Sequence, residues 1–331
     1  MSDGRPIGVF DSGIGGLTVV RALRRLLPAE SIVYFGDTAR FPYGTKSAET
    51  LVRIALEDAE FLLGRDVKQI VVACHSASST ALPELERRMP VPVLGVIVPG
   101  ARALVAATRK RRVAVIGTSA TIRSAAYERA IRNESRDVEI VAKATPLFVS
   151  LAEEGWLDGD VAQLVARRYL AGVVEEQVDA LLLGCTHFPL LADVIGRVLG
   201  PGVRLVDSSE ETAKAAAALL ESRNETCDAS RTGSLKVYLS DLAPNFEAVA
   251  TRFLGEPLGE VIRASVGTGG CVSHVLRPKE RTSSHESTKD TKRRGLDRSL
   301  AACRAQFPST KGRKSGGGEE SGKRRRMSDE N

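Results

Sequence analysis

Two cysteines of this 331-residue chain occupy matching places in the sequence. Cys74 follows the apolar run 70–73, Cys185 follows the apolar run 181–184, and a histidine and a hydroxyl side chain come directly after each cysteine. A cysteine between a buried strand and a helix meets the free N–H groups and the dipole of the helix N-terminus, which favour a thiolate. Both cysteines are therefore candidate nucleophiles or bases.

The duplication favours a pair of bases. A single cysteine at the end of an apolar strand is most often a small core residue. Two such cysteines, each followed by hydroxyl and imidazole groups, fit a site in which one thiolate removes a proton from one face of a carbon and the opposite thiol delivers a proton to the other face. Cysteine suits this chemistry because its surroundings can bring its pKa close to the operating pH.

A third polar junction lies in the N-terminal run 9–18, VFDSGIGGLT. Asp11 and Ser12 end its strand, and the glycines that follow let the backbone approach a ligand. The run does not fit the dinucleotide motif G-x-G-x-x-G, because Thr18 stands in the position of the last glycine and Asp11 would repel a pyrophosphate. The alternative is that these glycines serve only close packing.

The elements that must position these residues follow an alternating pattern from residue 7 to about 220. Apolar strands that alternate with helices predict mostly parallel sheets flanked by helices, with the ligand at the carboxyl ends of the strands. A further strand is expected at 235–240 and a closing helix at 244–254. The other predicted strands are 7–10, 32–36, 70–73, 93–96, 113–116, 139–142, 180–183 and 204–206, and the helices are 16–26, 47–64, 77–88, 100–108, 122–133, 159–177 and 211–222.

The net positive charge of the chain lies in its C-terminal segment. Residues 277–331 hold 16 Lys and Arg against 8 Asp and Glu, whereas residues 1–276 hold 31 against 33. The segment 268–331 is rich in Ser, Thr, Lys, Arg and Gly, a composition too polar to offset the entropy of ordering, so we predict a disordered basic tail. Its KRRR cluster also fits a nucleic-acid contact or an address signal. A charged, solvated tail with no partner is the favoured interpretation.

Cysteine spacing and hydropathy narrow the class of protein. Five widely spaced cysteines do not describe a disulfide framework, so reduced thiols are expected. No apolar run reaches the roughly 18 to 20 residues that a membrane span needs, and the N-terminus lacks the pattern of a signal peptide. We expect a globular protein of the cytoplasm without a membrane contact.

Six motifs in a fixed order then point to a family: GVFDSGIGGLTV, YFGDTARFPYG, VVACHSAS, VIGTSATIRSAAY, PLFVSLAEEG and LLLGCTHFPLL. From Pro6 to about Val266 the chain resembles glutamate racemases of the aspartate/glutamate racemase superfamily. The resemblance implies interconversion of L- and D-glutamate without pyridoxal phosphate, another cofactor or a metal, supplying D-glutamate for peptidoglycan. It also implies two similar α/β domains, 1–98 plus 207–267 and 99–206, with the active site in the cleft between them. A homodimer is one option for the assembly.

The same resemblance assigns roles to residues. Cys74 would be the base that deprotonates D-glutamate, and Cys185 the base for L-glutamate. Asp11 and His187 would assist the two cysteines, and Glu153 would tune the site electrostatically. The residues implied to bind substrate are Asp11, Ser12, Tyr43, Gly44, His75, Ser76, Thr118, Thr121, Thr186 and His187. From spacing alone, Thr118 fits a helix cap equally well.

The chain departs from the family pattern at His75 and Ser76, where the family usually has Asn-Thr. An imidazole can gain a charge near neutral pH, so His75 predicts a shifted pH optimum or substrate preference. The other interpretation is that His75 stays neutral and replaces the amide as a hydrogen-bond donor. Two alternative functions stay open for the chain. One is another racemase of the superfamily, such as an aspartate racemase. The other is a zinc hydrolase that uses the two Cys and His pairs, although neither pair has a CxxC or HxxxH spacing.

Overall fold

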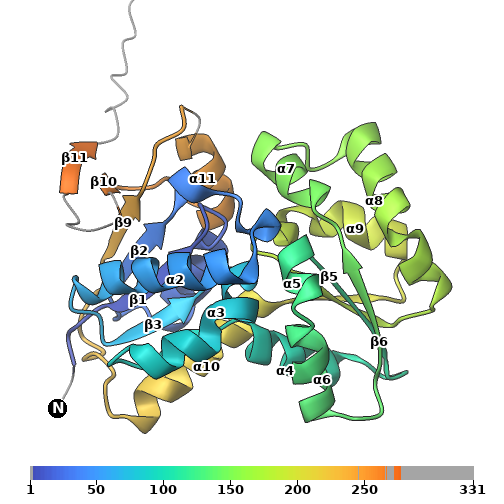
Figure 1. Cartoon of the computed structure of the whole chain (residues 1–331), viewed down its shortest axis with the longest axis horizontal. Coiled ribbons are helices and arrows are strands. Elements are labelled where there is room, and N and C mark those ends of the chain that lie inside the picture. The colour runs from blue at the N-terminus through green and yellow to red at the C-terminus, as the bar shows by residue number, and fades with distance from the viewer. Residues whose placement is uncertain (1–2, 245, 265, 267–271, 277–331) are drawn as a thin grey trace, which may run out of the picture. The chain divides into compact units, whose positions relative to one another are not determined.

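Two sheets form the framework of the protein (Figure 1). The computed structural model describes residues 3–244, 246–264, 266 and 272–276. The strands are β1 (Ile7–Asp11), β2 (Ile32–Gly36), β3 (Gln69–Val72), β4 (Val93–Gly95), β5 (Arg112–Gly117), β6 (Glu139–Ala144), β7 (Ala180–Gly184), β8 (Arg204–Asp207), β9 (Leu235–Leu239), β10 (Val261–Ala264) and β11 (Val272–Leu276). The larger sheet has the order β11-β10-β9-β2-β1-β3-β4, and the smaller sheet has the order β6-β5-β7-β8.

All of these strand pairs are parallel except β10 with β11. The central strands β1, β3 and β7 are buried along their whole length. Their near-continuous apolar sequences are typical of strands covered by helices on both faces. The predicted α/β class with mostly parallel sheets flanked by helices is confirmed.

The helices connect these strands. They are α1 (Leu17–Leu26), α2 (Ala48–Leu63), α3 (His75–Arg88), α4 (Ile97–Ala107), α5 (Ser119–Arg123), α6 (Ala126–Glu134), α7 (Leu147–Glu154), α8 (Gly159–Glu175), α9 (Ala192–Leu199), α10 (Ser208–Ser222) and α11 (Phe246–Leu254). Short 3-10 turns lie at Thr38–Arg40, Tyr43–Thr45 and Phe188–Leu191. None of the helices in the described part of the chain is both long and apolar enough to cross a bilayer.

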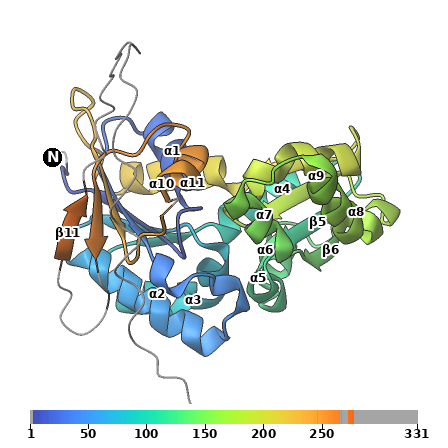
Figure 2. The same ribbon diagram turned by 90° about the horizontal axis from the view of Figure 1, so that it is seen from above.

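Helices cover both faces of each sheet. Figure 2 shows α1, α10 and α11 on one face of the larger sheet and α2 and α3 on the other. In the smaller sheet, Ala114 and Leu183 pack with buried residues of α7, α8 and α9, whereas Val113 and Leu182 belong to a core that also includes residues of α1, α4, α6 and α10. This second core is continuous from one sheet to the other, and both sheets belong to one compact unit, Met1–Glu280.

Every strand predicted above is present, and so is every predicted helix except 122–133, with shifts of a few residues at the ends. The range 122–133 is interrupted at Ala125, whose φ is 50°, so it holds the end of α5 and most of α6 instead of one helix. Helices α7 and α9 and strand β10 lay outside the prediction. Strand β11 pairs with β10 inside the range 268–331, which was predicted to be a disordered tail. Residues 277–331 of that tail lie outside the described residues. The division into domains at residues 98 and 207 stays a prediction.

Candidate active site

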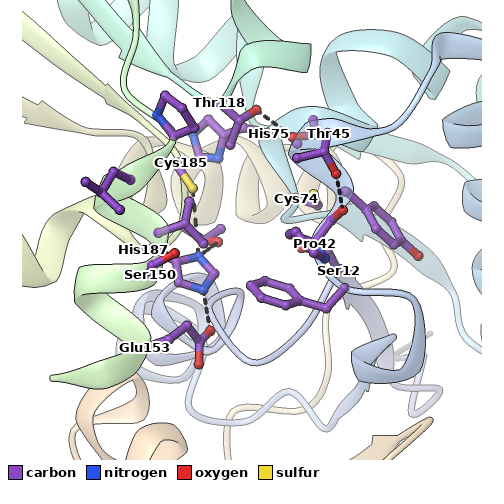
Figure 3. A pocket seen from close by; sticks show the side chains of 18 of the residues that line it. Ser12, Pro42, Thr45, Cys74, His75, Thr118, Ser150, Glu153, Cys185 and His187 are labelled. Atoms are coloured by element: carbon purple, nitrogen blue, oxygen red, sulfur yellow. Dashed lines mark hydrogen bonds and ion pairs between the residues drawn. The ribbon is translucent and has the colours of Figure 1, made fainter. Parts of the chain in front are cut away.

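A cavity of about 570 Å³ opens at the carboxyl ends of the strands, and both cysteines line it (Figure 3). Cys74 follows β3 of the larger sheet, and Cys185 follows β7 of the smaller sheet. Both side chains are buried, with 4% and 6% of their surface exposed. The fold thus brings together two thiols that are 111 positions apart in the sequence.

Cys74 is held as a neutral thiol. It occupies the N-cap position of α3, where the helix N-terminus was expected to favour a thiolate. Burial, together with the nearby Asp11 carboxylate, raises the pKa of Cys74 to about 12, although the Ala77 N–H and the Ser12 side chain act in the opposite direction. Burial therefore outweighs the helix N-terminus, and the expectation of a thiolate is wrong for Cys74.

Cys185 has different neighbours. Its Sγ lies 3.8 Å from Nδ1 of His187, and Nε2 of His187 lies 2.6 Å from Oε1 of Glu153. Thr186 Oγ1 lies 3.3 Å from the same Nδ1. Burial lowers the pKa of His187, but its hydrogen bonds and charge interactions with Cys185 and Glu153 outweigh burial and raise the pKa to about 10. His187 is therefore an imidazolium at neutral pH, held between Glu153 and Cys185.

Two of the expected site residues lie behind the cavity wall. Asp11 is fully buried at the end of β1 and is absent from the lining. Its Oδ2 accepts the Gly13 N–H at 3.1 Å, its Oδ1 has no partner within the described residues, and burial raises its pKa. Thr121 is also buried outside the lining, with Oγ1 3.0 Å from Oγ1 of Thr118. A role for either residue stays a prediction.

The other expected residues line the cavity: Ser12, Tyr43, Gly44, Cys74, His75, Ser76, Thr118, Glu153, Cys185, Thr186 and His187. Thr118 caps α5 by accepting the N–H of Thr121, and its Oγ1 also lies 2.9 Å from Ser76 Oγ. This contact joins the loop after β5 to the first turn of α3. Thr118 therefore serves as a helix cap and as part of the lining, so the two interpretations of its position are compatible.

Two glycines allow the loops of the two sheets to meet. A Cβ at Gly15 would lie 2.5 Å from Thr186 Oγ1 and 2.7 Å from Cε1 of His187. A Cβ at Gly44 would lie 2.6 Å from Cβ of Thr118. Real Cβ atoms do not approach other atoms this closely. The glycines thus let the loops pack closely, which fits the close-packing interpretation of the N-terminal run; approach of its backbone to a ligand stays a prediction.

His75 is neutral rather than charged. Only 3% of its surface is exposed, and burial, followed by the charge of His187, lowers its pKa to about 3. Its Nε2 lies 3.1 Å from Oγ of Ser208, at the start of α10. The expectation of an ionisation near neutral pH at this position is therefore wrong, because the imidazole is too deeply buried to hold a proton.

Tyr43 is held by a group of buried acidic residues that motif reasoning missed. Its Oη lies 2.5 Å from Oδ2 of Asp37 and 2.7 Å from Oδ2 of Asp58, and Arg40 pairs with Asp58 at 2.8 Å. Burial and the charge of Asp37 raise the pKa of Asp58 well above its usual value. The Tyr43 hydroxyl donates toward these two carboxyl groups, and Arg40 places a positive charge beside them. Asp58 lies within the pattern of α2, so only its burial distinguishes it from a surface carboxylate.

Sequence reasoning also missed part of the lining. The missed residues come from the turns after β2 and from α7 and α8: Phe41, Pro42, Thr45, Pro146, Leu147, Val149, Ser150, Glu154 and Tyr169. All of them except Thr45 and Tyr169 belong to two of the quoted motifs, YFGDTARFPYG and PLFVSLAEEG, and this was the available signal. In the part of the chain that the structure describes, no three His, Cys, Asp or Glu side chains gather closely enough to hold a metal ion.

Comparison with known proteins identifies the family. Residues 7–216 match the Asp/Glu/Hydantoin racemase family. A glutamate racemase of Geobacter metallireducens is 52% identical over 262 residues, which are 79% of this chain and 97% of that protein. The crystal structure of glutamate racemase from Francisella tularensis with D-glutamate has a TM-score of 0.76 at 37% identity, covering 80% of this chain and 99% of that one. The glutamate racemase from Thermus thermophilus with β-chloro-D-alanine has a TM-score of 0.72 at 49% identity, covering 80% and 98%. The resemblance seen in the six motifs is thus confirmed, and the chain belongs to the Asp/Glu/Hydantoin racemase family.

Proposed function

We propose that this racemase interconverts L- and D-glutamate by moving protons at the α-carbon between Cys74 and Cys185, without a cofactor. The observation that carries the proposal is the presence of both thiols, from two different sheets, in the lining of one cavity. The relatives named as glutamate racemases support the choice of substrate. The D-glutamate formed would supply peptidoglycan synthesis in the cytoplasm.

The different neighbours of the two thiols suggest a starting state. Cys185, next to the His187 cation, begins as the thiolate and removes the α-proton of L-glutamate. Cys74, held as a thiol, delivers its proton to the other face of the planar carbanion and becomes the thiolate. One S–H bond forms, one breaks, and the product is D-glutamate. Conversion of D-glutamate runs through the same steps in reverse.

The other site residues assist this exchange. Glu153 holds His187 in its charged form through the contact with Nε2, and His187 stabilises the Cys185 thiolate through Nδ1. Asp11 acts on Cys74 by its charge, which raises the pKa of that thiol. Ser12, Ser76, Thr118 and Thr186 supply hydroxyl groups for the polar ends of the substrate.

The proposal is tested with purified protein and no added cofactor. L-glutamate, D-glutamate and L-aspartate are incubated separately, and the two enantiomers are quantified by chiral chromatography. We expect both glutamate enantiomers to approach an equal mixture, with aspartate turned over at least about 100-fold more slowly. Fast aspartate turnover would point instead to an aspartate racemase. Absence of turnover on all three would overturn the proposal.

A further inference from the structure

A buried contact joins His75 of the cavity lining to the start of α10 behind it. His75 is the first residue of α3, Ser208 is the first residue of α10, and 133 positions separate them. Their Nε2 and Oγ atoms are 3.1 Å apart, and the two residues are 3% and 1% exposed. Ser208 does not line the cavity, so its effect on a substrate must pass through His75.

The other ring nitrogen of His75 has no partner. Its Nδ1 is buried and makes no hydrogen bond within the described residues. A buried ring nitrogen without a partner costs free energy, so its persistence needs an explanation. His75 belongs to the cavity lining, and Figure 3 shows it in the wall beside Thr118. A polar group of a bound substrate can supply the missing partner.

The hydroxyl of Ser208 determines which ring nitrogen carries the proton. Within the described residues its Oγ has two polar neighbours, Nε2 of His75 and the buried hydroxyl of Tyr127, which makes no other hydrogen bond. If Nε2 carried the proton, Ser208 would have to donate to Tyr127, the Tyr127 proton would lack an acceptor, and Nδ1 would be a buried acceptor without a donor. If Ser208 donates to Nε2, the hydroxyl is satisfied and the single proton of the neutral ring resides on Nδ1.

We propose that Ser208 is a positioning residue that fixes His75 in the tautomer with a proton on Nδ1, so that this N–H donates to a carboxylate oxygen of the substrate. The first turn of α3 favours the same ligand, because the N–H groups at a helix N-terminus attract anions. The ring is held from the side by Tyr127, whose ring centroid lies 6.1 Å away at an angle of 36°. The proposal rests on the proposed function for the identity of the substrate.

The chain offers a matched control. Ser209 is the neighbour of Ser208, is 5% exposed and donates to Oδ1 of Asp207 at 2.8 Å. Ser209 makes no hydrogen bond to His75 within the described residues. Ser209→Ala therefore removes a buried hydroxyl from the same turn of α10 without removing the contact to the imidazole.

The first test reads the tautomer directly, by the ¹⁵N chemical shifts of protein labelled in its histidines, with His75→Asn to assign the His75 signals. We expect a proton on Nδ1 of His75 in the unaltered protein and in Ser209→Ala, and a shift toward the Nε2-protonated form in Ser208→Ala. A proton on Nε2 in the unaltered protein would overturn the proposal. This measurement does not depend on turnover, so it stands even if glutamate is not the substrate.

The second test is a double-mutant cycle on glutamate turnover. Ser208→Ala should raise KM by about tenfold, with kcat changed less than about twofold, because a hydrogen bond to a charged group is weakened. In the His75→Asn background the same change should alter KM less than about twofold. An equal effect of Ser208→Ala in both backgrounds, or no effect in either, would overturn the positioning role. Lack of turnover in the unaltered protein would overturn the proposed function instead.

Discussion

Nε2 of His187 lies 2.6 Å from Oε1 of Glu153, while the opposite ring nitrogen faces the sulfur of Cys185. The imidazolium is therefore held between a carboxylate and a thiol. Among the described residues no cation occupies the equivalent place at Cys74, where burial and Asp11 favour the neutral thiol. The two halves of the site thus differ in charge, although their sequences follow one plan. This difference suggests which cysteine begins as the base.

Glu153→Gln should narrow the pH range of activity. The carboxylate helps to raise the pKa of His187 to about 10, so the cation persists below that pH and is lost above it. Without the carboxylate the pKa falls, and the loss of L-glutamate turnover on the alkaline side should move down by about one pH unit or more. The measurement is the pH dependence of kcat/KM.

Glu154→Gln is the matched control for that experiment. Glu154 also lines the cavity, but it makes no hydrogen bond or ion pair to His187 within the described residues. Its profile should match that of the unaltered protein. If both variants shift the alkaline limb equally, the effect reflects the total charge of the cavity rather than the contact between Glu153 and His187.

Replacement of either cysteine should stop racemisation in both directions. Each turnover needs one base and one acid, so Cys74→Ser and Cys185→Ser should each lower kcat by about 1000-fold or more, because serine is a far weaker acid. Cys227→Ser serves as the control, since Cys227 is a free, half-buried thiol outside the cavity lining. Turnover above a tenth of normal in either cavity variant would contradict the two-thiol mechanism.

Gly15→Ala should displace Thr186 and His187 and leave the rest of the fold unchanged. The added methyl would lie within 2.8 Å of three atoms of these residues, so His187 must move from its place beside Cys185. A displacement near 1 Å lowers catalysis by about 100-fold. Gly172→Ala, in α8 with no atom within 4 Å of the new methyl, should leave turnover unchanged. Normal kinetics of Gly15→Ala would show that the loop adjusts without cost.

Truncation separates the predicted tail from the ordered unit. A chain that ends at Glu280 should retain its melting temperature and turnover, since β11 ends at Leu276 and the compact unit ends at Glu280. A chain that ends at Gly267 lacks β11 and leaves one edge of β10 without its partner strand. Its melting temperature should fall by at least about 2 °C. Equal melting curves for the two truncated chains would show that β11 adds no stability.

The fold could be predicted largely from the alternation of apolar strands and helical patterns. Strand β7 is an unbroken run of five buried residues, ALLLG. An apolar run this short indicates a buried strand rather than a helix, which is usually at least about 10 residues long. Strand β10 escaped prediction because its four residues, VIRA, are too few for a period to be seen. Strand β11 lay in a segment whose overall composition indicates disorder, although pairing with β10 gives it a place at the sheet edge.

The motifs predicted which residues lie in the site when those residues directly follow a strand. They did not predict protonation states that depend on burial. The placement of Cys74, Cys185 and Glu153 in one cavity agrees with the expectation from the motifs. The neutral state of His75 and the raised pKa of Cys74 depend on desolvation by residues far away in the sequence. Asp58 shows the same limit, because its contact with Tyr43 exists only after α2 has packed.

The central claim is that two different groups exchange the α-proton, and the most direct test follows deuterium from D₂O during the first few per cent of conversion of L-glutamate. With two bases, the D-glutamate formed carries deuterium at the α-carbon, because Cys74 delivers a hydrogen that has exchanged with the solvent. The remaining L-glutamate keeps its protium, because Cys185 holds the proton that it removed. Mass spectrometry of the separated enantiomers gives the result. Early D-glutamate that retains the original protium, or deuterium that enters both enantiomers equally from the start, would contradict the account.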